Sequence, residues 1–481
     1  MLVCIAAVQL FAFAQPKYSG ARKVTIENGK MYVDGKPFYV NAAAATMAHT
    51  LMADYGANTC RIYGISSIKA GKAILDSLYA HGLMCYTGLP ATQAANIKKG
   101  QPGYEDPEWR AAKVASVMKI VNAFKDHPAV LCWSMGNEVE GAGHPTDEGI
   151  YRYYGELCAA IKAVDPNHPV TMAFTDAPDP RKVKLVNEFC PDVDFICHNT
   201  YYSILERHKA NDRVPYTDLL AEYGWTKPYM ITEYGPTGTW RRKDLSEEDR
   251  INDWGALIQL SAEEAALKYA ECYHIIKGYE NCLGSVAFWW GYQTHGQVLG
   301  WYPFFTKEMK VLPAAEAMES CWRGTEYNPK SPLVASWQNS ILLNGRPVYK
   351  GKKNKKNPTV EPGQKCTAKI IASCRSGNPD SSLEYKWFLY KDSVYKHRGS
   401  DTDWIAVTYN DCESMYDPKG GHKAMNEDAN AELFIDRTKS EVDFTAPTQT
   451  GGYRLYCIVT DPSNNRASSA CLNFYVGEIE E

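Results

Sequence analysis

Short apolar runs alternate with helical periodicity through the middle of the chain. Nearly continuous apolar runs indicate strands that are covered on both faces, and helices between successive strands indicate a parallel sheet. The predicted strands are Phe38–Ala42, Asn58–Tyr63, Leu83–Gly88, Val130–Met135, Val170–Phe174, Phe195–His198, Tyr229–Thr232 and Ser285–Trp289. Eight such strands predict an α/β fold, a (β/α)8 TIM barrel, over residues 24–325.

The segments between these strands carry helix signals. Asp106 is suited to cap a helix, Pro107 to occupy its first position, and apolar residues recur at helical spacing as far as Phe124. Two further stripes run from Ile150 to Val164 and over about 247–277. We expect each stripe to pack against the outside of the barrel.

The two ends of the barrel segment show a β pattern instead. Asn28-Gly29 and Asp34-Gly35 are strong hairpin signals and predict a small strand layer before the barrel. After Trp322 the βα alternation stops, and residues 326–358, with a lysine-rich run near their end, are predicted to form a linker. Strict alternation from Leu383 to Leu389 and later strand-like pieces predict an immunoglobulin-like β-sandwich over 359–478.

Residues 1–14 form an apolar run that ends in Ala12-Phe13-Ala14, a pattern typical of a signal peptide. We therefore expect a secreted or periplasmic protein. The positively charged region that usually precedes such a run is missing, and a buried first strand is the alternative interpretation. No other stretch is apolar for long enough to span a membrane.

Composition narrows the possible partners. The 481 residues are enough for two or three domains. A net charge of −4 with interspersed signs gives no basic surface for nucleic acid, and the eleven histidines show no metal-ligand spacing, so no cofactor is expected. Most of the fifteen cysteines lie in apolar segments and are predicted to be buried thiols. Four near the C-terminus could pair after export, namely Cys366, Cys374, Cys457 and Cys471.

Two glutamates follow apolar strands at the positions where a barrel places its active site. Glu138 closes the fourth predicted strand and Glu233 the seventh. Two carboxylates that face each other across a barrel are what cleavage of a glycosidic bond needs, one to protonate the leaving oxygen and one to attack the anomeric carbon. Glu222 repeats the Glu-Tyr-Gly tripeptide but lies in a helical stretch, and Glu140 precedes a glycine-rich loop.

The stretch His127 to Glu138, which ends in Gly136-Asn137-Glu138, and the stretch Thr232-Glu233-Tyr234-Gly235 resemble the clan A glycoside hydrolases, and most closely the TIM-barrel domain of glycoside hydrolase family 2. The resemblance implies that Glu138 is the acid/base and Glu233 the nucleophile. It further implies that Asn137 binds a sugar 2-hydroxyl, that Arg61 lies against the nucleophile, and that Tyr201 orients it.

Aromatic residues at the end of the eighth strand suit the floor of a sugar site. Trp290 is the preferred candidate, although Trp289 competes with it because adjacent strand residues point to opposite sides. Trp301 is a candidate for a further subsite. His198 is evenly balanced between a sugar contact and a core position.

Together these observations predict a retaining β-glycosidase that hydrolyses a β-linked polysaccharide or oligosaccharide by double displacement. Two alternatives stay open. A transglycosylase of the β-1,3-glucan type would use the same two glutamates, and a non-catalytic protein would only bind glycan. The sugar, its linkage and the oligomeric state have no signal in the sequence, because loop shapes around the site set specificity.

Overall fold

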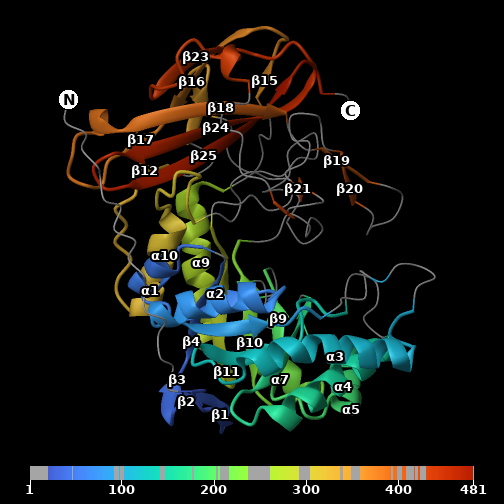
Figure 1. Ribbon diagram of the computed structural model, residues 1–481. Coiled ribbons are helices and arrows are strands. Elements are labelled where there is room, and N and C mark those ends of the chain that lie inside the picture. Colours follow the sequence, from blue (N-terminus) through green and yellow to red (C-terminus); the bar gives the residue numbers. More distant parts are fainter. Residues whose placement is uncertain are drawn as a thin grey trace, which may run out of the picture.

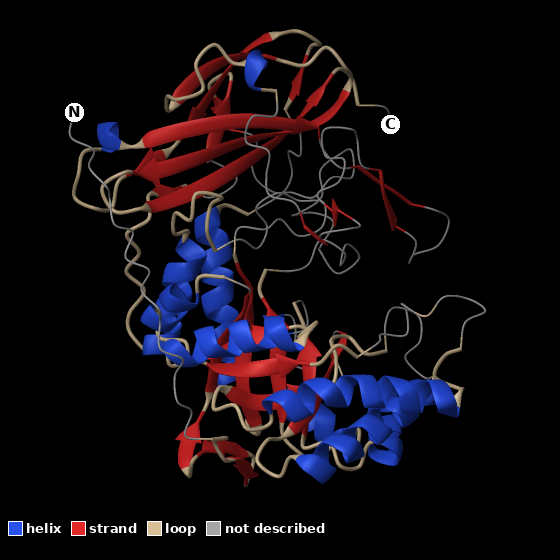
Figure 2. Cartoon of the chain, in the orientation of Figure 1, coloured by secondary structure: helices blue, strands red, loops and turns tan. Residues whose placement is uncertain are grey.

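The chain forms a barrel surrounded by helices, with a second body made of strands beside it (Figures 1 and 2). The computed structural model describes residues 20–45, 47–91, 97, 102–140, 147–175, 178–201, 204–205, 216–236, 260–291, 304–335, 340–347, 358–391, 394–397, 404–407, 416–417, 421–422 and 430–479. The predicted signal peptide at 1–14 lies outside them. Within these ranges no helix combines the length and the apolar character needed to cross a membrane.

The barrel is closed, and its strands all run parallel. The eight strands are β4 (Val40–Ala45), β5 (Thr59–Ile62), β6 (Met84–Gly88), β7 (Val130–Ser134), β8 (Val170–Thr175), β9 (Phe195–Asn199), β10 (Tyr229–Tyr234) and β11 (Cys282–Trp290). Every predicted barrel strand overlaps one of these, so the TIM barrel is confirmed. Its closing contact pairs β11 with β4, which is the first strand of the barrel.

Helices cover the outside of the barrel (Figure 2). Those described are α1 (His49–Asp54), α2 (Ile68–Ala80), α3 (Pro107–Phe124), α4 (Glu148–Val164), α5 (Pro180–Phe189), α7 (Tyr216–Glu222), α9 (Ala262–Lys277) and α10 (Pro313–Arg323). Asp106 caps α3 as predicted, because its carboxylate accepts hydrogen bonds from the backbone N–H groups of Glu108 and Trp109. The third predicted helix is confirmed over α9; residues 247–259 lie outside the described ranges.

A three-stranded sheet covers the amino end of the barrel. It consists of β1 (Val24–Glu27), β2 (Lys30–Val33) and β3 (Lys36–Phe38). Both predicted hairpin turns have positive φ angles at their two central residues, which is why Asn-Gly and Asp-Gly occupy them. Met31 and Val33 are buried in the same core as the barrel, and the sandwich lies on the opposite side (Figure 1). The predicted strand layer is confirmed.

Two four-stranded sheets pack into a β-sandwich with its own core. One contains β14 (Arg346–Pro347), β13 (Ile341–Leu343), β16 (Lys365–Ile370) and β23 (Glu441–Thr445); the other contains β15 (Thr359–Val360), β25 (Arg466–Val476), β24 (Gly451–Asp461) and β18 (Glu384–Lys391). The remaining strands lie in pairs, namely β12 (Leu333–Val334) with β17 (Ala372–Ser373), β19 (Val394–His397) with β20 (Trp404–Val407), and β21 (Tyr416–Asp417) with β22 (Gly421–His422). The predicted sandwich is confirmed, and its immunoglobulin-like type stays a prediction.

The predicted linker at 326–358 differs from the structure. β12, β13 and β14 lie within it, and β13 pairs with β16 of the sandwich. The apolar residues Ile341 and Leu343 are buried in the sandwich core. Strands of two or three residues leave too short an alternation to be separated from a loop by sequence, so their pairing depends on the sheet they join.

The sandwich is attached to the barrel by backbone and side-chain contacts. Val311, which precedes α10, forms a parallel β-bridge with Arg466, the first residue of β25. Arg466 donates to the buried Glu316 at 2.7 Å. Arg375 of the sandwich pairs through both terminal nitrogens with Glu263 of α9. Through these contacts the sandwich and the barrel share one interface.

All thirteen described cysteines are free thiols, and twelve of them are buried. The prediction of buried thiols is confirmed for these residues. Cys366, Cys374, Cys457 and Cys471 do not form the disulfides that export would allow. Cys457 lies in the sandwich core and Cys471 on the other face of its sheet, so the two side chains point apart.

Candidate active site

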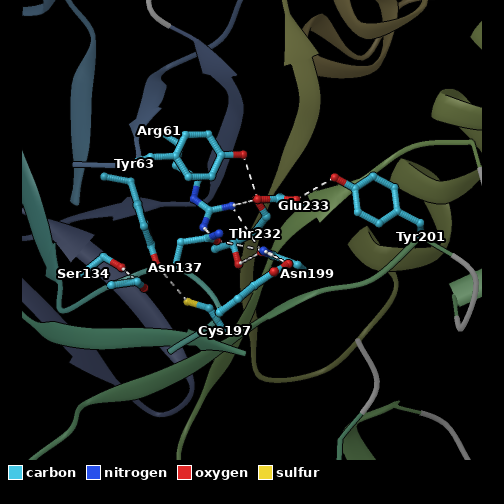
Figure 3. A network of polar contacts seen from close by, with 12 residues as sticks. Arg61, Tyr63, Ser134, Asn137, Cys197, Asn199, Tyr201, Thr232 and Glu233 are labelled. Carbon is cyan, nitrogen blue, oxygen red and sulfur yellow. Dashed lines mark hydrogen bonds and ion pairs between the residues drawn. The ribbon is translucent and has the colours of Figure 1, made fainter. Parts of the chain in front are cut away.

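Glu138 and Glu233 both lie at the carboxyl end of the barrel, as the strand pattern predicted. Glu233 is within β10, and Glu138 follows β7 by four residues. A hydrogen-bonded network of residues in or just after β5, β7, β9 and β10 connects them. Figure 3 shows the part of it around Glu233. Because the strands are parallel, side chains far apart in sequence meet at this one end.

The Glu233 carboxylate accepts hydrogen bonds at both oxygens. The Arg61 guanidinium donates to Oε1 at 2.8 Å, and the Tyr63 hydroxyl donates to the same oxygen at 2.7 Å. The Tyr201 hydroxyl donates to Oε2 at 2.6 Å (Figure 3). The Glu233 carboxyl group therefore lies against one cation and two hydroxyl donors.

Arg61 is almost fully buried and supplies the positive charge of the site. Besides Glu233, its terminal nitrogens donate to the Thr232 carbonyl at 2.6 Å and to Asn137 Oδ1 at 2.7 Å. The guanidinium also lies over the Tyr63 ring, 4.5 Å from its centroid. These contacts fix the cation against Glu233, in the position that the sequence resemblance implied for it.

Asn199 is the junction of the network. Its amide nitrogen donates to Glu138 Oε1 at 3.0 Å and to Asn137 Oδ1 at 2.9 Å. Its oxygen accepts from Arg61 at 3.2 Å and from the Thr232 hydroxyl at 3.0 Å. The two donors on Asn137 Oδ1 fix the orientation of the Asn137 amide. Asn199 thus links Glu138 to Arg61, and Arg61 in turn bonds Glu233.

Glu138 has an unusual backbone conformation and an altered acidity. Its φ angle is +48°, in the left-handed region, which costs a non-glycine residue roughly 1–2 kcal/mol. Burial, and then the negative charge of Glu233, raise the pKa of Glu138 above its ordinary value. Asn199 opposes this shift by donating to the carboxylate. Glu138 therefore keeps its proton to a higher pH than an exposed glutamate would.

The surroundings separate the two carboxyl groups chemically. Glu233 is held by a cation and two hydroxyl donors, whereas Glu138 is partly buried, accepts from one amide and lies within the field of Glu233. A proton donor beside an ionised carboxylate can protonate a leaving group while the carboxylate attacks.

His198 does not line the site, so its proposed sugar contact is wrong. On β9 the flanking residues Cys197 and Asn199 point into the barrel, and His198 therefore points outward. Its ring packs between Phe174 of β8 and Tyr216 of α7, and the residue is 2% exposed. Burial, with a smaller effect of the nearby Lys182 charge, lowers the pKa of His198 to about 3.

Trp290 is also not a sugar platform. It is fully buried, donates to the Ala48 carbonyl and packs against Phe304, Phe305 and Trp322. Its neighbour Trp289 is half-buried and stacks on Tyr63 with centroids 5.9 Å apart; the peptide bond from Phe288 to Trp289 is cis. Of the two candidates, Trp289 is therefore the one that lies beside the Glu233 network. Trp301 lies outside the described residues.

Sequence reasoning missed Tyr63 and Asn199. Tyr63 follows Arg61 by two residues, and period-two alternation places both on the inner face of the barrel. Asn199 follows His198 directly, at the end of a predicted strand. Both signals were present, but polar residues at strand ends are too common for either to stand out without the partners across the barrel.

Two other glutamates lie apart from this network. Glu222, in the second Glu-Tyr-Gly tripeptide, is the exposed last residue of α7. Glu140 is buried in an ion pair with Lys182. Among the described residues, no group of three histidine, cysteine or acidic side chains could hold a metal ion.

Residues 73–240 match the model of the TIM barrel domain of glycosyl hydrolases family 2, a region that includes both Glu138 and Glu233. Solved structures with a similar fold include a β-D-glucuronidase of Dictyoglomus thermophilum (18% identity, TM-score 0.47, 64% of this chain and 54% of that one). They also include a β-glucuronidase of Ruminococcus gnavus (20%, 0.46, 63% and 53%). A third is a β-galacturonidase of Eisenbergiella tayi (16%, 0.44, 64% and 54%).

This chain spans about half the length of these proteins. With eight parallel strands in a closed barrel and the family match over 73–240, the barrel of this chain resembles the TIM barrel domain of glycosyl hydrolases family 2, as the sequence indicated.

Proposed function

We propose that this protein is a retaining β-glycosidase that hydrolyses O-glycosidic bonds, with Glu138 as acid/base and Glu233 as nucleophile. The observation that carries the proposal is the network through Asn199 and Arg61, which joins two glutamates in opposite electrostatic surroundings. The family match over residues 73–240 supports the class of enzyme.

In the first step, Glu138 donates its proton to the leaving-group oxygen while a Glu233 oxygen attacks the anomeric carbon. The bond to the leaving group breaks, and a glycosyl ester of Glu233 forms. Arg61, Tyr63 and Tyr201 hold the carboxylate in place before attack. Trp289 offers a ring face, next to Tyr63, on which the sugar can stack.

In the second step, Glu138 acts as a base. Once Glu233 is an ester, its negative charge no longer raises the pKa of Glu138, so the carboxyl group is more easily ionised. Glu138 then takes a proton from water, and the resulting hydroxide attacks the anomeric carbon. The Glu233 ester breaks, and the product keeps the β configuration.

We further propose that the protein is exported and acts on a β-linked oligosaccharide or polysaccharide. The apolar segment at 1–14, with its small-x-small end, supports export. Comparing expression of the full chain with a variant that begins at Gln15 tests this point. The full chain should lose that segment and appear in the periplasm or medium, whereas the shortened chain should stay in the cytoplasm.

The first test of the activity uses 4-nitrophenyl β-glycosides of glucose, galactose, mannose, xylose, glucuronic acid and galacturonic acid, beside β-glucans, galactans, mannans and xylans. We expect at least one substrate to be cleaved with retention, which NMR of the first-formed anomer measures. Glu138→Gln and Glu233→Gln should each lower kcat/KM on the order of 10³-fold or more with an unactivated leaving group.

Glu222→Gln is the matched control, because Glu222 lies in the same Glu-Tyr-Gly tripeptide but is exposed on α7. It should keep full activity. An inverted product would contradict the double displacement. Longer products made with an acceptor sugar would favour a transglycosylase, and binding without turnover would favour a glycan-binding protein.

A further inference from the structure

A buried ion pair lies two residues beyond Glu138. The Lys182 ammonium donates to Glu140 Oε1, and the two side chains are 10% and 1% exposed. The same oxygen accepts from the Thr175 hydroxyl at 2.7 Å and from the Thr175 backbone N–H at 3.0 Å. Lys182 also donates to the Thr175 carbonyl at 3.3 Å. Glu140 therefore ties the chain to the end of β8 and to α5.

The contacts of Glu140 are the last in a series that involves each residue from 137 to 140. Asn137 accepts from Arg61 and Asn199, Glu138 accepts from Asn199, and Val139 donates its backbone N–H to the Ala173 carbonyl at 3.2 Å. Glu140 is the last of the series. The left-handed φ of Glu138 is thus held by contacts on both sides, which a strained conformation requires in order to persist.

Net stabilisation is a poor explanation for the pair, because burying two charges costs about as much as their attraction returns. Its surroundings are weakly polar. Tyr151 and Tyr154 of α4 lie within the field of Glu140, the Lys182 ammonium lies 5.9 Å from the Phe174 ring centroid, and His198 is kept neutral nearby. A buried ion pair in such surroundings fixes geometry, since neither charge has another partner of opposite sign among the described residues.

We propose that the Glu140–Lys182 pair is a positioning element for Glu138, which holds the turn that directs the Glu138 carboxyl group toward Asn199. This inference rests on the proposed role of Glu138 as acid. Neither residue of the pair hydrogen-bonds to the Glu233 network, so the pair positions Glu138 through the backbone of residues 138 and 139. The Glu140 charge also raises the pKa of Glu138, but by less than burial and the Glu233 charge do. Its loss should impair protonation of the leaving group and spare the nucleophile.

Leaving-group dependence separates these effects. A 2,4-dinitrophenyl glycoside needs no proton to leave, whereas a phenyl glycoside does. We expect Glu140→Gln and Lys182→Met to lower kcat/KM for the phenyl glycoside by about 10- to 100-fold, because small misplacements of a reacting group cost this much. With the 2,4-dinitrophenyl glycoside, kcat/KM for bond cleavage should change less than about threefold. The sugar is the one cleaved fastest in the panel above.

Two variants guard against a general loss of structure. Lys182→Arg keeps the charge and should restore most of the phenyl glycoside activity. Lys162→Met removes a more exposed lysine, which pairs with Asp194 at 2.6 Å just before β9, at the opposite end of that strand from Asn199. It should affect both glycosides equally and little. If Glu140→Gln does not fold, Thr175→Val removes one hydrogen bond to Glu140 and keeps both charges.

Amide hydrogen exchange supplies a readout that needs no substrate. The Val139 N–H is bonded to Ala173, and its exchange should accelerate at least tenfold in Lys182→Met but not in Lys162→Met. Unchanged exchange, or an equal loss on both glycosides, would overturn the inference. If Glu138→Gln keeps phenyl glycoside activity, the proposed function is wrong. If Glu138→Gln loses this activity but the Glu140 and Lys182 variants keep it, the proposed function stands and the positioning role is wrong.

Discussion

Glu138 and Glu233 have chemically identical side chains but different electrostatic surroundings. Glu233 receives three donors, including a buried guanidinium, whereas Glu138 receives one amide and lies within the field of Glu233. Burial and that field raise the pKa of Glu138. Such a separation of two carboxyl groups is what allows one to act as an acid while the other is ionised.

The raised pKa of Glu138 has a consequence for stability. In the unfolded chain the group titrates near 4.3, and in the folded chain at a higher pH, so the protonated group favours folding. This contribution is complete below the unfolded value and is lost as the pH rises through the folded value. Glu138→Gln, which cannot ionise, should therefore have a higher Tm than the wild type at pH 8 and the same Tm at pH 4.

Glu233→Gln is the contrasting variant for the same calorimetric measurement. It leaves the buried Arg61 without its carboxylate, so its Tm should fall below that of the wild type at pH 8. A Glu138→Gln variant that loses stability with rising pH as steeply as the wild type would contradict the assignment of the raised pKa.

Tyr63 carries a second prediction, because it donates to the same Glu233 oxygen as Arg61. Burial, and then the Glu233 charge, raise the pKa of Tyr63, so its hydroxyl stays a donor throughout the working range. Tyr63→Phe should lower kcat about 10- to 100-fold, as expected for one hydrogen bond to a charged group, with the fold intact. Steady-state kinetics check this, with Tyr32→Phe at the other end of the barrel as the unaffected control.

At the scale of elements, the alternation of a strand decides which residues reach the site. On β9, Asn199 points inward and His198 points into the helix layer. On β11, Trp290 enters the core around Trp322, whereas Trp289 stacks on Tyr63. Neighbouring residues in the sequence therefore have unrelated roles.

The adjacent tryptophans of β11 make this contrast testable. Trp290→Ala should destabilise the fold by roughly 3–5 kcal/mol, because it leaves a cavity among buried rings. Trp289→Ala should cost much less stability but raise KM, because it removes the ring face beside Tyr63. Denaturant unfolding and steady-state kinetics of the two variants measure this. Equal losses of stability would mean that Trp289 is also a core residue.

At the scale of the whole molecule, the sandwich and the barrel share an interface. Glu316 of α10 accepts from Arg466 of β25 and from the backbone N–H groups of Lys330 and Ser331. Leu312 belongs to the same apolar cluster as Phe388 and Tyr456 on the outer face of the sandwich sheet. The sandwich thus contacts both α9 and α10, the helices that precede and follow the last barrel strand, β11.

This interface predicts coupled unfolding. Arg466→Met leaves the nearly buried Glu316 without its cation and should destabilise the protein by about 2 kcal/mol. This is less than the loss of one partner from a fully buried pair would cost, because Arg466 is partly exposed. Calorimetry should show one transition for the wild type and a split or earlier one for the variant. Arg22→Met, which breaks an exposed pair with Asp34, should change little. Two separate transitions in the wild type would mean that the two bodies unfold independently, and an unchanged transition in Arg466→Met would mean that this ion pair does not stabilise the interface.

Much of the fold could be predicted because local patterns determine it. Eight apolar runs, the cap at Asp106 and the Asn-Gly and Asp-Gly turns all appear in the structure where the sequence placed them. The linker was wrong over β12 to β14, since strands of two or three residues form only against an existing sheet. Glu138, Glu233, Arg61, Asn137 and Tyr201, which the strand ends and the family resemblance singled out, lie in one hydrogen-bonded network.

The sequence by itself determined the barrel, the order of its strands and the two glutamates at its carboxyl end, because periodicity and motifs act over a few residues. Only the tertiary structure decided which of two adjacent side chains faces inward, as for Trp289 and Trp290, and which residues meet across the barrel. Asn199 and Tyr63 gain their importance from partners more than sixty residues away. Such contacts follow from the closure of the sheet, and no local pattern encodes them.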